Sequence, residues 1–299
     1  MNKKELWNIY MRACRIYARK LNDRPADVPY RLLCSIEFWK EHRYWPHIKN
    51  PRSFSEKIFH RMLFNRDPQL TVLSDKWKAR SFIGNLVGNQ YLIPVLWQGD
   101  NPEDIPFDSL PDKYVIKTNH GAGFNIIVPN KFNVDAERVK RQLRLWLKAN
   151  FCYSTLLGMS WAYKNIKPTV IIETFLENNG AVPEDYKFFC FAGKVEYIQV
   201  SLDRFGNASE QILNSEFDAL PLWNRCRVFP GKLKIPDNFI LMKALAETIS
   251  KEFDFIRVDM YNVAGRIYIG ELTFYPAAGL ARFIPVKYDF IFGKKWKTI

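Results

Sequence analysis

The spacing of hydrophobic residues predicts helices in the first part of the chain. In residues 4–22, apolar side chains recur every three or four positions and share one helical face, with basic residues beside it. Residues 30–66 continue this pattern, with breaks at prolines. Ser53 is followed three positions later by Glu56, a spacing typical of a helix N-terminus.

A further helix and a short strand are expected next. The segment SDKWKARSFIGNLVG predicts a helix capped by Ser74 or Asp75 and ending near Gly84 or Gly88. The segment QYLIPVLWQ at 90–98 then predicts a short strand.

After residue 110 the pattern predicts mainly strands. Paired strands are expected at 111–129, 185–204 and 255–276, each pair joined by a glycine-bearing turn, and a buried strand at 167–176. Helices are expected at 134–150 and at 237–253, the second capped by Asp237. Sequential hairpins with few helices between them indicate an α+β fold with mostly antiparallel sheets.

Composition narrows the class of protein. The chain has 299 residues, of which 47% are hydrophobic and 25% charged, as in a folded globular protein. No stretch approaches the roughly 18 uncharged apolar residues of a membrane-spanning helix. The five cysteines form no CxxC pair, which argues against a zinc site or a disulfide framework and favours a reducing compartment. The charged N-terminus does not resemble a signal peptide, so a cytoplasmic location is expected.

Positive charge is concentrated near the N-terminus. The formal net charge is +13, and residues 1–66, with 15 basic and 6 acidic side chains, contribute +9 of it. This excess predicts an anionic partner for residues 1–66. The helix at 4–22 either packs on the body of the protein or lies on an anionic membrane surface. A peripheral position at the inner membrane face is therefore a possible location, and no nucleic-acid partner is expected.

A lysine followed by a glycine loop is the first candidate site. Lys117 ends an apolar strand, and Gly121-Ala122-Gly123 follow it. Such a loop exposes backbone N–H groups to a phosphate, and the lysine adds a positive charge. The pattern is not a Walker A loop, and an ordinary glycine hairpin tip explains it about as well.

The last hairpin carries the second candidate site. Arg257 and Asp259 share one face of their strand, and Glu271 and Thr273 share one face of the returning strand. Two carboxylates facing each other in a half-buried sheet call for a cation, and oxygen ligands suit Mg²⁺. The alternative is a surface ladder in which Arg257 pairs with Glu271.

Two further segments contain polar side chains at strand ends. Glu173 ends the apolar run at 167–176, where a carboxylate and free backbone groups can bind an adenine edge. Asp185 and Lys187 share one face at the start of a strand, and Lys187 can meet a phosphate. An ordinary strand end and a solvated strand face are the alternatives.

Together, and in this order, these features resemble the ATP-grasp superfamily. The similarity includes SDKWKAR and the YLIPVL strand upstream. Within the superfamily, the chain is most similar to the TupA-like branch, which is found among genes for cell-surface polysaccharide biosynthesis. The segments that carry this similarity are FSEKIFHRMLFNRD, SDKWKAR, YLIPVL, KTNHGAGFNIIV, DYKFFCFAGKV and FIRVDMY with GELTFYPAAG. They span about residues 51–282.

The resemblance implies a domain organisation. An ATP-grasp fold has two α+β lobes that clasp ATP between mostly antiparallel sheets. The first two expected parts are a helical basic N-terminal segment at residues 1–70 and a pre-grasp portion at 71–112. The other two are a small lobe with the glycine hairpin at 113–180 and a large lobe with the metal site and the acceptor loop at 181–299.

The resemblance also implies roles for individual residues, with ATP and Mg²⁺ as cofactors. Lys78, or Lys76 as the nearby alternative, and Lys117 would hold the α- and β-phosphates, and Gly121, Ala122 and Gly123 would close over the β/γ-phosphates. Glu173 and the backbone of Phe175 and Leu176 would meet adenine, and Glu177 or Asp185 the ribose. Lys187 would face the γ-phosphate, Asp259 and Glu271 would bind Mg²⁺, and Arg257 would stabilise the acyl-phosphate and the oxyanion that follows.

Two positions are less clear. The superfamily usually has Glu-x-Asn as its last metal motif, whereas this chain has Glu271-Leu272-Thr273, and a hydroxyl is a poorer Mg²⁺ ligand than an amide oxygen. The TupA-like branch shares this change. His120 is the one histidine in a candidate site, where it acts as a base, contacts a phosphate, or stabilises the loop.

The implied reaction is ATP-dependent amide formation through an acyl-phosphate. The carboxylate would belong to a sugar such as a uronic acid in a surface polysaccharide, and the amine to an amino acid or amino sugar, or the reverse. Tyr275 to Gly279 form a candidate acceptor loop. The alternatives are a glycosyltransferase, a kinase using the same ATP residues, and a non-catalytic module that binds polyanions or membranes.

Overall fold

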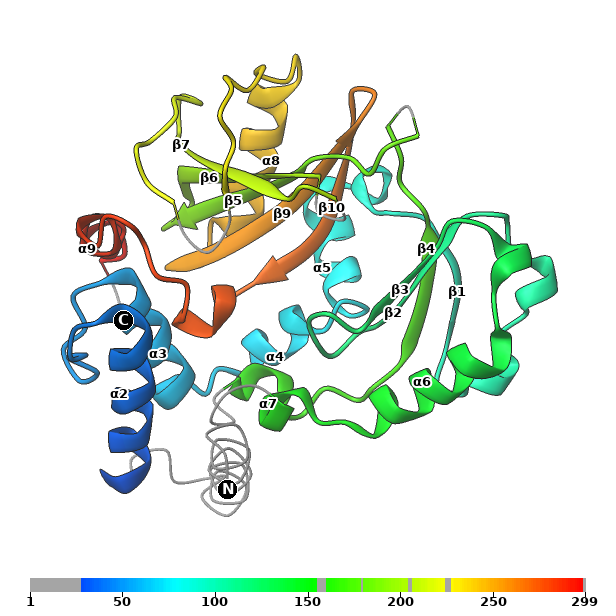
Figure 1. Cartoon of the computed structure of the whole chain (residues 1–299), viewed down its shortest axis with the longest axis horizontal. Coiled ribbons are helices and arrows are strands. Elements are labelled where there is room, and N and C mark those ends of the chain that lie inside the picture. Colours follow the sequence, from blue (N-terminus) through cyan, green and yellow to red (C-terminus); the bar gives the residue numbers. More distant parts are fainter. Residues whose placement is uncertain (1–27, 155–159, 179, 204–205, 224–226, 298–299) are drawn as a thin grey trace.

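The computed structural model describes residues 28–154, 160–178, 180–203, 206–223 and 227–297 (Figure 1). The helix predicted at 4–22 lies outside these residues. The described helices are α2 (Val28–His42), α3 (Phe54–Phe64), α4 (Pro68–Ser74), α5 (Ala79–Val87), α6 (Ala136–Lys148), α7 (Phe151–Ser154), α8 (Phe239–Ser250) and α9 (Lys287–Lys295). The strands are β1 (Val95–Gly99), β2 (Tyr114–Thr118), β3 (Asn125–Val128), β4 (Val170–Thr174), β5 (Asp185–Phe191), β6 (Lys194–Leu202), β7 (Ser209–Asn214), β8 (Arg227–Val228), β9 (Phe255–Val263) and β10 (Arg266–Thr273).

The predicted helix ends are partly confirmed. Ser53 and Glu56 form the reciprocal capping box of α3. Asp75 accepts hydrogen bonds from the backbone N–H groups of Trp77 and Lys78, at 2.9 and 3.2 Å, and thereby caps the turn that leads into α5. At the other end of α5, the C-cap is Gly88, with φ +107°.

Three details of the prediction are wrong. Asn238, not Asp237, is the N-cap of α8, and it makes no side-chain capping bond. β1 begins only at Val95, because Asn89–Tyr91 form a 3-10 turn and Pro94 lies between them. A separate helix, α4, precedes Asp75 and was not predicted.

The strands form two sheets, which confirms the α+β expectation. A four-stranded sheet has the order β1-β4-β2-β3, and a six-stranded sheet the order β10-β9-β5-β6-β7-β8. Every strand pair within these sheets is antiparallel except β7 with β8. The two sheets stand apart in Figure 1, and α4 and α5 lie near their junction. β1, which falls in the expected pre-grasp portion, joins the four-stranded sheet.

Each sheet has one apolar face that is covered by helices. In the four-stranded sheet, Tyr114, Ile116 and Ile172 belong to a hydrophobic core shared with Val139 and Leu143 of α6. In the six-stranded sheet, alternate residues of β5 and β9 pack against α8 in the larger core. Because strand side chains alternate between faces, the residues between these core positions point to the opposite side of each sheet.

Candidate active site

The faces of the two sheets opposite α6 and α8 line one cleft, although α3 and α9 cover part of this face in the six-stranded sheet, where Phe54 and Phe292 contact Phe189. Its cavity has a volume of about 330 Å³. Its lining includes residues of both sheets, of the glycine loop and of the turn before α5. The predicted site residues among them are Lys76, Lys117, Gly121, Ala122, Gly123, Glu173, Phe175, Leu176, Asp185, Lys187, Arg257, Asp259 and Glu271. Segments more than 150 positions apart in the chain therefore meet at one place.

The final hairpin supplies a compact charged group. The guanidinium of Arg257 donates two hydrogen bonds to Asp259, from Nε to Oδ1 and from Nη2 to Oδ2, each 2.6 Å long. Nη2 also donates to Thr273 Oγ1 at 3.2 Å and lies 3.6 Å from Glu271 Oε1. The β9–β10 register pairs Asp259 with Glu271 and Arg257 with Thr273. The ion pair of the surface-ladder alternative is thus present, but it lies inside the cleft.

The two carboxyl groups have opposite pKa shifts. Burial raises the pKa of Asp259 to about 7, against the attraction of the Arg257 guanidinium. Burial also raises the pKa of Glu271, but Lys76 and Arg257 outweigh it, and the pKa of Glu271 is lowered to about 2. Glu271 is therefore an ionised carboxylate at neutral pH, while Asp259 depends on its arginine or on a metal ion to stay charged.

These oxygen atoms suit Mg²⁺. Asp259, Glu271 and the Thr273 hydroxyl are hard ligands, which Mg²⁺ prefers in combination with water and substrate phosphates. The described part of the chain contains no group of three or more His, Cys, Asp or Glu side chains that could hold a metal by themselves. A metal ion here would therefore depend on phosphate oxygens to complete its coordination.

The opposite wall of the cleft carries cations. Lys117 Nζ lies 2.6 Å from Glu173 Oε2, and Arg80 Nη1 lies 3.3 Å from the other oxygen of Glu173. Arg80 was not among the predicted site residues, although its position in SDKWKAR, one helical turn after Lys76, was a usable signal. The buried Glu173 carboxylate, near the end of β4, thus contacts two cations.

Lys76, not Lys78, reaches into the cleft. Lys76 Nζ donates to the Gly121 carbonyl at 2.5 Å and lies 3.4 Å from Glu271 Oε2, so it bridges the two walls. Lys78 is exposed and does not line the cavity. The first choice for this phosphate contact is therefore wrong. The physical reason is that residues 75–78 form a capped turn, which turns the two lysines in different directions.

The glycine loop is anchored by Asn119. Its Nδ2 donates to Asp75 Oδ1 at 2.9 Å, and its Oδ1 accepts from the Thr169 backbone at 2.8 Å. Gly123 has φ +77° and open space where a side chain would begin. The loop backbone can therefore approach a ligand closely.

His120 lies behind this loop and not in the cleft. It is 1% exposed, and its Nε2 lies 3.1 Å from the carbonyl oxygens of both Trp146 and Ala149. Burial lowers the pKa of His120, which favours the neutral ring. The prediction that His120 acts as a base or contacts a phosphate is therefore wrong. Of the three roles considered for this residue, the geometry is compatible only with stabilisation of the loop.

The remaining predicted residues separate into two groups. Lys187 pairs with Asp185 in the cleft and donates to Ser201 Oγ at 3.2 Å. Glu177 instead pairs with Lys113, at 2.7 Å, outside the cavity lining. Of the two candidates for a ribose contact, only Asp185 lines the cleft.

The comparisons with known proteins identify the fold and the family. The cleft between two mostly antiparallel sheets is that of an ATP-grasp protein. The family model described as "TupA-like ATPgrasp" matches residues 56–297. The chain therefore belongs to the TupA-like ATP-grasp family. Among proteins with curated descriptions, none matches the chain.

Several solved structures are similar at low identity. The ATP-grasp ligase PsnB, complexed with a precursor variant, Mg and ADP, is 14% identical, with a TM-score of 0.44 over 77% of this chain and 61% of that one. The D-alanine–D-alanine ligase of Bacillus anthracis with ATP is 16% identical, with a TM-score of 0.39 over 68% and 53%. The L-amino acid ligase of Bacillus licheniformis is 15% identical, with a TM-score of 0.42 over 66% and 42%. The chain thus spans less than two thirds of the length of these proteins.

Proposed function

We propose that the protein is an ATP-dependent carboxylate–amine ligase. The observation that carries this proposal is the opposition, across one cleft, of the Arg257–Asp259–Glu271 group to Lys76 and Lys117. One side offers carboxylates for a metal and a guanidinium for an oxyanion, and the other offers cations for phosphates. Phosphoryl transfer needs chiefly such positioning and charge neutralisation.

The residues of the cleft divide between nucleotide and reaction centre. Lys76, Lys117 and the loop Gly121–Gly123 would hold the phosphates, while Glu173 and the backbone of Phe175 and Leu176 would contact adenine. Asp185 would face the ribose and Lys187 the γ-phosphate. Asp259 and Glu271, with Thr273 beside them, would hold Mg²⁺, which supplies charge neutralisation on the phosphates when bound.

The chemistry follows from these positions. A substrate carboxylate oxygen attacks the γ-phosphorus, the bond to the β-phosphate oxygen breaks, and ADP leaves. The amine nitrogen then attacks the acyl carbon, and phosphate and one proton leave as the amide forms. Arg257 would stabilise the negative oxygen of the tetrahedral intermediate.

The substrates proposed are a sugar carboxylate and an amine. A uronic-acid-type carboxylate and an amino acid or amino sugar, or the reverse arrangement, would place the enzyme in capsule or other surface polysaccharide biosynthesis. The support for this is the family membership. The buried thiols of Cys34, Cys152 and Cys190 support the proposed cytoplasmic location.

Measuring both products of ATP distinguishes the proposed reaction from its rivals. We expect ADP and free phosphate in equal amounts, formed only when Mg²⁺, a carboxylate such as glucuronate and an amine are all present. Hydroxylamine can replace the amine and trap the acyl-phosphate as a hydroxamate. A kinase would release ADP while its acceptor kept the phosphate, and a non-catalytic module would release neither. ADP without free phosphate, for every carboxylate and amine tested, would contradict the ligase proposal.

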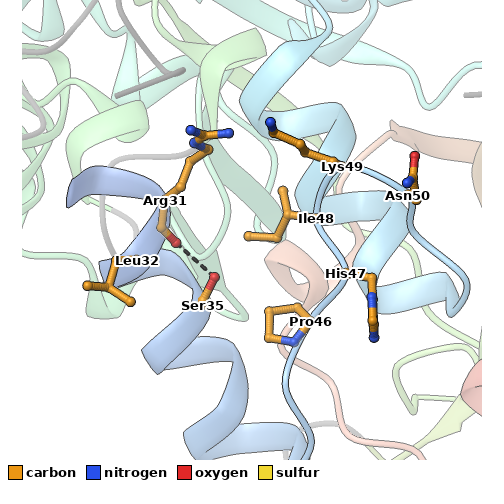
Figure 2. A pocket seen from close by; sticks show the side chains of 8 residues that line it. All are labelled: Arg31, Leu32, Ser35, Pro46, His47, Ile48, Lys49 and Asn50. Carbon is orange, nitrogen blue, oxygen red and sulfur yellow. Dashed lines mark hydrogen bonds between the residues drawn. The ribbon is translucent and has the colours of Figure 1, made fainter. Parts of the chain in front are cut away.

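We also propose a peripheral contact between residues 1–66 and an anionic membrane. A pocket of about 380 Å³ lies beside α2. In Figure 2 the Arg31 and Lys49 side chains reach the same end of it. Leu32 lines this pocket, Trp39 lies further along α2 and Trp45 precedes Pro46 of the lining, and these three residues are 51%, 46% and 51% exposed. Exposed tryptophan beside basic side chains is typical of a membrane–water interface. In the described part of the chain, no helix has the length and apolar character needed to cross a bilayer.

Charge reversal at this pocket is expected to weaken binding to anionic vesicles. Each Lys or Arg near such a surface contributes about 1 kcal/mol, so Arg31→Glu with Lys49→Glu should reduce the bound fraction strongly in co-sedimentation. Arg138→Glu with Arg141→Glu on α6 makes the same charge change at exposed positions elsewhere and should have a smaller effect. Equal vesicle binding by wild type and by both double variants would contradict the membrane proposal.

A further inference from the structure

A second cavity adjoins the first at Arg257. It has a volume of about 220 Å³ and lies between α3, the 3-10 turn η7 (Pro276–Gly279) and the face of the six-stranded sheet opposite α8. Arg257 is in the lining of both cavities. A molecule in the second cavity therefore sits beside the proposed reaction centre, on the side away from the adenine contacts.

The walls of this second cavity are mostly apolar. The apolar wall residues are Phe54 and Ile58 of α3, Phe189 of β5, and Phe283. Each of these residues is at most 5% exposed. Together with the volume, this lining suits a compact apolar body and does not suit a large polyhydroxylated one.

Two polar side chains in the lining of the cavity can accept hydrogen bonds. Glu210 on β7 is the one carboxylate in the lining, among the residues that the structure describes. Ser201 donates to its Oε1 at 3.0 Å, and that hydroxyl in turn accepts from Lys187. Gln199, 7% exposed as a residue, lines the same cavity with its side-chain amide. An amide that faces a cavity offers a ligand both a carbonyl acceptor and an N–H donor.

The pairing of strands in the six-stranded sheet connects Glu210 with the charged residues of the active site. β9 and β5 pair Arg257 with Phe189 and Asp259 with Lys187, and β6 and β7 pair Ser201 with Glu210. Charged groups of alternating sign therefore run across the sheet, from the Arg257–Asp259 pair through Lys187 to Glu210. A ligand along this line would present a cationic end to Glu210 and its remainder to the apolar walls.

We propose that this cavity binds the amine substrate, a compact molecule with a primary ammonium group and an apolar body. The Glu210 carboxylate accepts hydrogen bonds from the ammonium, the Gln199 carbonyl oxygen provides a second acceptor, and the phenylalanine walls hold the body. This inference rests on the proposed function and narrows its amine from an amino sugar to a small, amino-acid-sized compound.

The floor of the cavity is rigidly built, which supports a specific fit. Ala277, Ala278 and Gly279 have φ angles of +47°, +52° and +68°, a strained run that persists only where the surroundings hold it. The His42 ring binds the Gly279 carbonyl at 2.8 Å. A side chain on Gly279 would lie 2.7 Å from Phe59. Such a floor limits the ligand to a small size.

The test is ligand-observed NMR on the full chain, with isobutylamine as the probe and isobutanol as its neutral isostere. We expect the amine to bind wild type and the alcohol to bind much more weakly. Glu210→Gln should weaken amine binding about tenfold, since a charge-assisted hydrogen bond is lost. Glu210→Lys, which brings its own ammonium, should abolish it. Glu216→Gln, at an exposed carboxylate after β7, should bind like wild type.

The outcomes separate this inference from the proposed function. Amine binding that is unchanged in both Glu210 variants, alcohol binding equal to amine binding, or no amine binding by a wild type that binds Mg-ATP would overturn the cavity assignment. Amine binding that depends on Glu210, in a protein that fails to bind Mg-ATP, would support the assignment and overturn the proposed function.

Discussion

Arg257→Lys is expected to lower the rate of ADP and phosphate formation by about a hundredfold to a thousandfold, the usual cost of losing one oxyanion-stabilising group. Arg257 uses Nε and Nη2 together to hold Asp259, and it contacts Thr273 and Glu271 as well. A lysine keeps the charge, but it has one nitrogen and cannot make the bidentate pair. Mg-ATP affinity should change much less, because Lys76 and Lys117 lie on the opposite wall.

The measurement is steady-state turnover with saturating Mg-ATP, in parallel with nucleotide binding. Arg282→Lys makes the same chemical change at an exposed position and should keep wild-type turnover. If Arg257→Lys also keeps wild-type turnover, Arg257 has no role in the chemistry. Arg257→Ala is a less clean variant, since it leaves Asp259 buried without its partner and is expected to destabilise the fold by about 3–5 kcal/mol.

Strand alternation allowed much of the reaction centre to be predicted. The spacing of Arg257, Asp259, Glu271 and Thr273 placed them on one face of a hairpin, and the observed register brings them together. This alternation is reliable because the side chains of a strand point to opposite faces with a period of two residues. Packing or distant contacts can move a residue to the other face only where a bulge interrupts the strand. A bulge does occur between Ile269 and Glu271, and it preserves the pairing of the polar residues.

Positions that depend on turns or on distant packing could not be predicted. Lys76 and Lys78 are two residues apart, and only the Asp75-capped turn decides which of them enters the cleft. His120 is adjacent to the glycine loop, yet the carbonyls that hold it come from the end of α6. The contact of His42 with Gly279 joins residues 237 positions apart and has no local signal.

The second large effect is expected at Lys117. Its Nζ is the cation nearest to Glu173, and the residue lies on the strand that leads into the glycine loop. Lys117→Ala removes a charge-assisted contact to phosphate, which should weaken Mg-ATP binding about tenfold or more. It also leaves Glu173 with Arg80 as its remaining cation. Lys113→Ala, at the residue just before the same strand, removes a lysine that pairs with Glu177 outside the cleft, so it is the matched control and should bind as wild type does.

The central claim is that the cleft between the two sheets binds Mg-ATP, and calorimetric titration tests it most directly. Mg-ATP is titrated into wild type, Lys117→Ala and Lys113→Ala, with GTP as the nucleotide control. We predict micromolar binding of ATP to wild type and to Lys113→Ala, weaker binding of GTP, and ATP binding about tenfold weaker or more in Lys117→Ala. No ATP binding by a folded wild type, or equal ATP binding by wild type and Lys117→Ala, would contradict the assignment of this cleft as the nucleotide site.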